Sequence, residues 1–139
     1  MKSEVWPRMV DLRSLSNSEL KLVIAAHRAD DSPAALRAWL DVVRDALEAR
    51  RRERDRDWAL CALAIARRYW ELLESAPTFS LLFSAETAFE HHDDFAMAAR
   101  CVEQAAKASL DMGCEDDAMA LLMQAVRVEN KHGALRRMA

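Results

Sequence analysis

The sequence predicts an all-α protein, and its sparse use of turn-forming residues is the main reason. Only two glycines and three prolines occur in 139 residues, whereas turns and strand bends depend on both residue types. Most of these residues lie between long runs rich in Ala, Leu, Arg and Glu, which favour helix. We therefore expect about six antiparallel helices that form a helical bundle or a short α-solenoid.

Length and charge limit the class of protein further. A chain of 139 residues is most simply one domain with a buried core, and we expect an arm at 1–15, a helical domain at 16–132 and a short basic tail at 133–139. The net charge of −3 gives no overall attraction to nucleic acid or to an anionic membrane. No run of about 18 apolar residues and no secretory apolar core is present, so we expect a cytoplasmic protein without a membrane-spanning segment.

Capping signals mark the first two helices. Ser16 and Glu19 have the spacing of a capping box, which predicts a helix from about 17 to 29. Ser32 followed by Pro33 is typical of the start of a second helix. The apolar stripe of this second helix is formed by Leu36, Leu40, Val43 and Leu47.

The middle of the chain is expected to provide the centre of the fold. Residues 50–57 alternate arginines with acids, and they either turn the chain or continue the second helix into the third. From 58 to 73 apolar residues occupy nearly every side, as in a helix that is surrounded by other helices.

Three more helices are expected in the second half. The first has Thr78 as its cap and runs to about 91, and the next covers about 94–112, with Gly113 as its C-terminal glycine. The last extends from near Glu115 to Gly133. Because all the connections are short, the six helices should stack as three hairpins. The inward-facing residues of the last helix are expected to be Ala118, Leu121, Leu122, Ala125 and Val128.

A regular pattern of large and small residues runs through the second half. It consists of Leu82, Ala85, Phe89, Phe95, Ala98, Val102 and Ala105, followed by Gly113, Ala118, Leu122 and Ala125. Over roughly residues 79–130 this pattern resembles the tetratricopeptide-type helical repeat, although Glu86 occupies a position that is usually small. The resemblance implies a concave surface that binds a peptide or a partner helix without catalysis.

Candidate partner-binding residues come from the arm, the Arg-rich segment and the last helix. A tryptophan in the arm is a possible interface anchor, and the arginines suit an acidic partner surface. Methionines fill irregular cores and also line adaptable grooves. The candidates are Trp6, Arg50, Arg51, Arg52, Arg54, Met119 and Met123.

One cluster has metal-ligating residue types, namely His91, His92, Asp93 and Asp94. Adjacent histidines point about 100° apart on a helix, so they do not readily bind one ion, and no second cluster completes a coordination shell. Histidine near a helix C-terminus and aspartate near an N-terminus are both favoured by the helix dipole. We therefore expect helix caps here rather than a metal site, and no cofactor.

Catalytic groups have little support in the sequence. Cys61, Cys101 and Cys114 are odd in number and far apart, which predicts three reduced core thiols rather than disulfides or a zinc site. Glu86 and Glu90 are four residues apart on one helix, a spacing that suits acid–base work but is more typical of a solvated face.

The sequence thus predicts a non-catalytic interaction module, such as an adaptor, a chaperone-like domain or a regulator, that binds another protein or itself. One alternative is a transcription-related regulator that contacts nucleic acid through Arg50–Arg56. Acids interleave these arginines and weaken any attraction to phosphate, so nucleic acid is not the expected partner. Another alternative is a bundle that binds a small ligand or a metal in its core.

Overall fold

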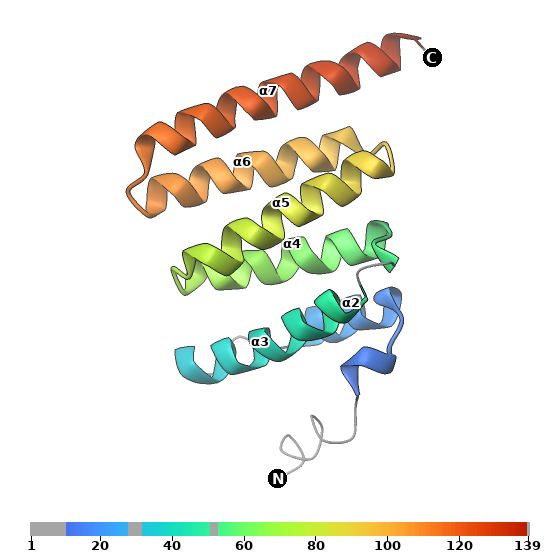
Figure 1. Cartoon of the computed structure of the whole chain (residues 1–139), viewed down its shortest axis with the longest axis vertical. Coiled ribbons are helices and arrows are strands. Elements are labelled where there is room, and N and C mark those ends of the chain that lie inside the picture. Colours follow the sequence, from blue (N-terminus) through green and yellow to red (C-terminus); the bar gives the residue numbers. More distant parts are fainter. Residues whose placement is uncertain (1–10, 28–31, 51–52, 139) are drawn as a thin grey trace.

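The computed structural model describes residues 11–27, 32–50 and 53–138, and every regular element in them is helical (Figure 1). A short 3-10 helix, η1 (Leu12–Ser14), precedes six α-helices. These are α2 (Asn17–Ala26), α3 (Pro33–Ala49), α4 (Arg56–Glu71), α5 (Ser75–His91), α6 (Phe95–Asp111) and α7 (Glu115–Met138). The prediction of an all-α fold is confirmed.

The helices form an elongated stack in which α4, α5, α6 and α7 follow one another in chain order (Figure 1). Helix α5 packs against both α4 and α6, and α7 packs mainly along α6. Helices α2 and α3 lie at one end of the stack, and α7 lies at the other. Helix α7 therefore has a helix of the described chain on one side only.

The first two helices do not form the hairpin that was expected. Both α2 and α3 pack on α4 more extensively than on each other, because their apolar residues converge on the same central helix. The side chains of Trp58 and Tyr69 are almost fully buried there, and each donates a hydrogen bond to α3. Trp58 Nε1 lies 3.0 Å from the carbonyl oxygen of Leu47, and the Tyr69 hydroxyl lies 2.6 Å from Asp41 Oδ1. The prediction of α4 as a central helix agrees with this packing.

The Arg-rich segment turns the chain. Helix α3 ends at Ala49 and α4 begins at Arg56, so the two are separate helices. Asp55 caps α4, since its Oδ1 accepts the backbone N–H of Trp58 at 2.8 Å. The capping box of α2 is also present, with Ser16 and Glu19 bonded to each other's backbone N–H groups.

Three turns of one kind join the last four helices. Each contains one residue with left-handed backbone dihedrals, namely Leu73 (φ 57°), Asp93 (φ 59°) and Gly113 (φ 80°). These residues lie 20 positions apart. In each turn the following residue donates its N–H to the carbonyl five residues earlier, as in a Schellman motif. The chain therefore reverses after equal lengths, and equivalent positions recur every 20 residues from α4 to α7.

The start of α5 differs from the expectation that Thr78 caps it. The helix begins at Ser75, and Pro77 lies in its first turn, where a proline is tolerated because no intrahelical N–H partner is needed. The Thr78 hydroxyl instead donates a hydrogen bond to the carbonyl of Glu74, at 2.6 Å.

The end of α7 also differs from the expectation. The helix passes through Gly133 and continues to Met138, so the predicted basic tail is helical over 133–138. A single glycine inside a helix costs only about 1 kcal/mol relative to alanine, and the packing of the preceding turns can offset this cost.

We predict that Leu73→Gly stabilises the protein by about 1 kcal/mol, because a left-handed conformation is strained for leucine and unstrained for glycine. Leu73 is 64% exposed, so little apolar burial is lost. Gly113→Ala should destabilise by about 1 kcal/mol, and the cost is purely conformational, since a Cβ at this position meets no atom within 4 Å. Urea unfolding measures both changes.

The matched control for this prediction is Leu22→Gly. Leu22 is also an exposed leucine (67%), but it lies within α2, where glycine destabilises by about 1 kcal/mol. Equal destabilisation by Leu22→Gly and Leu73→Gly would show that the left-handed turn is not the origin of the effect.

Candidate functional site

The described residues of α7 carry two apolar faces, of which one is covered. The covered face of α7 packs along α6 and includes Ala118, Leu121, Ala125 and Val128. Its other face carries four exposed apolar side chains at positions i, i+3, i+4 and i+7, a spacing that makes one continuous stripe on a helix. We call this stripe the α7 apolar face, and it consists of Met119 (63% exposed), Leu122 (42%), Met123 (55%) and Val126 (55%).

The 20-residue register explains the exposure of this face. The positions equivalent to Leu122 in the three preceding helices are Ala62, Leu82 and Val102, and none is more than 1% exposed. The positions equivalent to Val126 are Ala66, Glu86 and Ala106, and none is more than 8% exposed. Helices α4, α5 and α6 each have neighbours on two sides, whereas α7 has a neighbour on one. Leu122 and Val126 therefore occupy positions that the stack buries elsewhere, whereas Phe83, at the position equivalent to Met123, is 37% exposed.

Two of the sequence-predicted binding residues, Met119 and Met123, lie on this face. Leu122 was expected to face inward, and the structure shows it exposed. Contact with α6 uses the residues at 118, 121, 125 and 128, and Leu122 is rotated about 100° beyond Leu121, away from α6. Sequence reasoning also missed Val126. The i, i+3, i+4, i+7 spacing of the four residues is the signal that could have identified the stripe.

Charged side chains flank the α7 apolar face unevenly. The first turn of α7 contains three exposed acids, Glu115, Asp116 and Asp117. Further along, Arg127 is exposed and Lys131 Nζ lies 4.9 Å from the centre of the Phe95 ring. The face is thus acidic at the N-terminal end of the helix, with two cations towards its other end.

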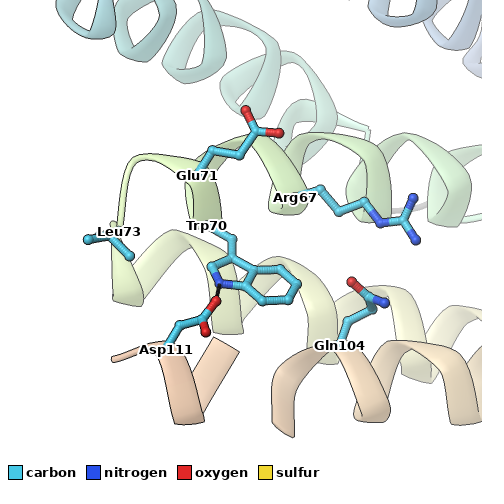
Figure 2. A pocket seen from close by; sticks show the side chains of 6 residues that line it. All are labelled: Arg67, Trp70, Glu71, Leu73, Gln104 and Asp111. Carbon is cyan, nitrogen blue, oxygen red and sulfur yellow. Dashed lines mark hydrogen bonds between the residues drawn. The ribbon is translucent and has the colours of Figure 1, made fainter. Parts of the chain in front are cut away.

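A shallow pocket of about 470 Å³, which the sequence did not predict, lies beside α4 and α6 (Figure 2). Its lining consists of Arg67, Trp70, Glu71, Leu73, Gln104 and Asp111. Trp70 Nε1 donates a hydrogen bond to Asp111 Oδ2 at 2.7 Å, which fixes both side chains. No local sequence signal identifies this pocket, because tertiary packing brings together residues about 40 positions apart.

Arg50, a predicted partner-binding residue, lies inside the fold. Its side chain is 8% exposed. Its guanidinium donates hydrogen bonds to the backbone carbonyls of Leu12, Leu15 and Ala46 and to Asn17 Oδ1. These contacts join η1, the start of α2 and the end of α3, so the guanidinium is occupied in holding helix ends together.

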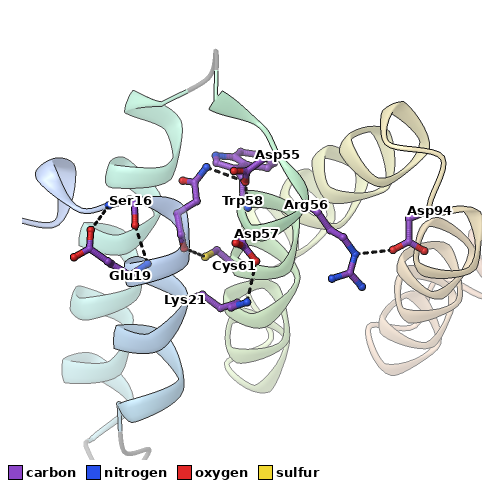
Figure 3. Close-up of polar contacts among 10 residues, drawn as sticks. Ser16, Glu19, Lys21, Asp55, Arg56, Asp57, Trp58, Cys61 and Asp94 are labelled. Carbon is purple, nitrogen blue, oxygen red and sulfur yellow. Dashed lines mark hydrogen bonds and ion pairs between the residues drawn. The ribbon is translucent and has the colours of Figure 1, made fainter.

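The other described arginines of this segment also contact parts of the fold. The guanidinium of Arg54 lies 4.4 Å from the centre of the Trp58 ring. Arg56 Nε lies 2.9 Å from Asp94 Oδ2, which joins the start of α4 to the residue before α6 (Figure 3). Three predicted binding residues lie outside the described part of the chain, namely Trp6, Arg51 and Arg52.

The His91–Asp94 cluster is divided among several local roles. His92 Nε2 lies 3.1 Å from the carbonyl oxygen of Arg54, and Asp93 is the left-handed residue of its turn. Asp94 caps α6, since its Oδ1 accepts the N–H of Met97 at 3.2 Å. Within the described ranges, no group of three or more His, Cys, Asp or Glu side chains is placed to hold a metal ion.

The three cysteines do not share one environment. Cys61 and Cys101 are buried as expected, and burial raises the pKa of each thiol to about 12, so neither is a nucleophilic thiolate near neutral pH. Cys114 was expected in the core, but it is exposed, because it directly follows the turn residue Gly113 at the start of α7.

Replacing Arg50 with alanine should lower the free energy of unfolding by about 2–4 kcal/mol, because several buried carbonyls lose a charged donor. Arg50→Lys should recover part of this loss, since an ammonium group reaches fewer of these acceptors. The control is Arg37→Ala. Arg37 is 59% exposed and pairs with Glu74 at 3.1 Å, so its loss should cost at most about 0.5 kcal/mol in urea unfolding. Equal effects at the two positions would contradict the structural role of Arg50.

The buried carboxyl of Glu86 predicts a pH dependence. Burial raises its pKa above the usual 4.5, the charge of Glu90 raises it further, and a 3.0 Å hydrogen bond from Gln124 lowers it. Since the folded state disfavours the ionised form, this carboxyl destabilises the fold increasingly as pH rises from about 4.5 through the raised pKa.

Glu86→Gln should therefore raise the Tm at pH 7, and this gain should shrink as the pH is lowered towards 4. Thermal unfolding followed by circular dichroism at a series of pH values measures the effect. Glu71→Gln, at an exposed position of α4, should change the Tm little at any pH. A gain at Glu86 that is independent of pH would rule out titration of this carboxyl as its cause.

Comparisons with protein-family models, curated proteins and solved structures find no match to this chain. Among the described helices, none combines the length and the apolar character needed to cross a bilayer.

Proposed function

We propose that this protein is a non-catalytic interaction module and that the α7 apolar face is its binding surface. The observation that carries the proposal is the exposure of four apolar side chains on one face of α7, two of which, Leu122 and Val126, lie at positions that the stack buries in α4, α5 and α6. An amphipathic helix that lies along α7 and carries its own i, i+3, i+4, i+7 stripe is the partner that fits this surface. Such a helix would occupy the place of a next helix in the stack.

The size of the surface is consistent with reversible binding. Each of the four side chains is about half exposed, so complete burial of each contributes about 1 kcal/mol, and the four together contribute about 4 kcal/mol. Association also has an entropic cost, so contacts by the flanking charges would be needed for a stable complex. Met119 and Met123 have flexible side chains that can adapt to the shape of a partner.

The cysteine thiols and Arg50 give less support to a different function than the α7 apolar face gives to binding. The thiols of Cys61 and Cys101 are buried with raised pKa values, and Arg50 is occupied by backbone carbonyls. The resemblance to tetratricopeptide-type repeats favours the same class of function, since such repeats bind peptides or helices. The proposed partner binds α7 at the end of the stack rather than a concave face.

The test is a comparison of two matched substitutions, Val126→Lys and Val42→Lys. Val126 (55% exposed) belongs to the α7 apolar face, whereas Val42 (56% exposed) lies on α3 at the other end of the stack. We expect proteins captured from cell extract by the wild-type chain to be lost with Val126→Lys and retained with Val42→Lys. Circular dichroism checks that both variants fold.

Capture of the same proteins, in the same amounts, by the wild-type chain and both variants would contradict the proposed surface. Loss with Val42→Lys and retention with Val126→Lys would move the binding surface to α3.

A further inference from the structure

We propose that the pocket beside α4 and α6 binds a small aromatic carboxylate, whose ring stacks on Trp70 and whose carboxylate is held by Arg67 and Gln104. The site goes beyond the proposed function, because α7 contributes no residue to its lining. Three features of the pocket support this inference: a tryptophan ring held in one orientation, an arginine without a partner, and an amide donor that faces this arginine from the other helix.

The pocket has the size and the mixed lining of a small-molecule site. Its volume of about 470 Å³ lies within the range of about 300–1,000 Å³ that such sites occupy. Trp70 and Leu73 provide apolar surface, and the other four lining residues are polar or charged. The ligand that suits this lining has a flat apolar body with a charged group at its edge.

Trp70 provides a flat surface of fixed orientation. Its Nε1 donates a hydrogen bond to Asp111 Oδ2 at 2.7 Å, which joins α4 to α6 and holds the ring in place. Figure 2 shows Asp111 at the N–H edge of the indole and Gln104 on the side of its six-membered ring. Because Asp111 already satisfies the only polar group of the indole, the ring offers its face for stacking with another aromatic ring.

Arg67 differs from the other two arginines of α4, because these have partners. Arg56 pairs with Asp94 at 2.9 Å, and Arg68 donates a hydrogen bond to the carbonyl of His27 at 3.0 Å. No hydrogen bond or ion pair joins Arg67 to another residue of the described chain. A guanidinium stays charged at neutral pH, and its fork of N–H donors matches the two oxygens of a carboxylate.

Gln104 adds a second donor from the opposite helix. In Figure 2, Arg67 of α4 and Gln104 of α6 extend towards each other into the space between the two helices. The Gln104 side chain also forms no hydrogen bond with another described residue. Its NH₂ group can donate to one carboxylate oxygen while the guanidinium binds the other. A carboxylate placed between them is therefore bound from both helices.

The two acids of the lining favour a singly charged anion. Asp111 Oδ2 accepts the indole N–H, so this carboxylate has a role within the fold. Glu71 lies four residues after Arg67 on α4, yet the two form no ion pair, and its carboxylate points away from Gln104 in Figure 2. Both acids repel a doubly charged phosphate more strongly than a carboxylate, and a cation would face the charge of Arg67.

NMR titration of the isotope-labelled full chain with sodium 2-naphthoate tests the inference. The indole N–H of Trp70 gives one of four tryptophan side-chain signals, and Trp70→Phe identifies this signal by its absence. We expect the Trp70 signal to shift, with half-saturation at about 1 mM, the affinity typical of a ligand with about 13 non-hydrogen atoms. Naphthamide and naphthylmethylammonium, which have the same ring without the carboxylate, should bind at least about fivefold more weakly.

Arg67→Gln and Arg100→Gln are the matched substitutions. Both remove the charge of an exposed arginine, but only Arg67 lines the pocket. Arg67→Gln should weaken the binding of naphthoate at least about fivefold, whereas Arg100→Gln should leave it unchanged. Val126→Lys should also leave naphthoate binding unchanged, so failure of this site and failure of the α7 apolar face are separate results.

Each outcome decides for or against the site. No shift of the Trp70 signal up to about 10 mM naphthoate would overturn it. Equal binding of naphthoate and naphthamide, or an equal loss in the two arginine variants, would overturn the assignment of a carboxylate to Arg67. Tighter binding of the ammonium than of naphthoate would overturn it in favour of a cation site. A Trp70 shift that requires both the carboxylate and Arg67 supports the inference.

Discussion

The left-handed residue in each tight turn between α4 and α7 is the constraint on which the rest of the stack depends. Positive φ at Leu73, Asp93 and Gly113 ends three helices in the same way, and the same backbone hydrogen bond closes each turn. Because the turns recur every 20 residues, positions with the same place in the repeat lie at equivalent places on successive helices. The exposure of Leu122 and Val126 can therefore be compared directly with that of their counterparts, and the contrast identifies a face without its neighbour.

A second constraint acts at the other end of the molecule, where α2 and α3 meet α4. Backbone carbonyls at helix ends have no intrahelical partner, and three carbonyls of this region converge on Arg50. Asn17 extends this network, since its side-chain amide donates to the carbonyl of Glu53 and to Asp55 Oδ1. The Arg-rich segment thus joins the first two helices to the stack. A run of charges in a sequence does not distinguish this structural role from a solvated binding patch.

Local signals were sufficient to predict the fold class and several helix boundaries. The capping box at Ser16, the Ser32–Pro33 start and the turn at Gly113 each depend on a few neighbouring residues. Turns near Leu73 and Asp93 were also expected, but their left-handed conformation was not, because residues other than glycine adopt it there. The burial of Arg50, the exposure of Leu122 and the pocket at Trp70 depend on helices far apart in the chain, and no local pattern specifies them.

The exposed apolar residues on the outer face of α7 are the physical basis for the proposed partner helix. The end of a helical stack is usually closed by a polar outer face, because water then replaces the missing neighbour at little cost. Helix α7 differs from this, since Ala118, Leu121, Ala125 and Val128 pack against α6 while Met119, Leu122, Met123 and Val126 are exposed. The two alanines on the covered side allow α7 to approach α6 closely, and four large apolar residues are exposed on the other side. A helix that only terminated the stack would lose nothing from polar residues at these four positions, and this is the physical basis for the proposal that a further helix covers the face.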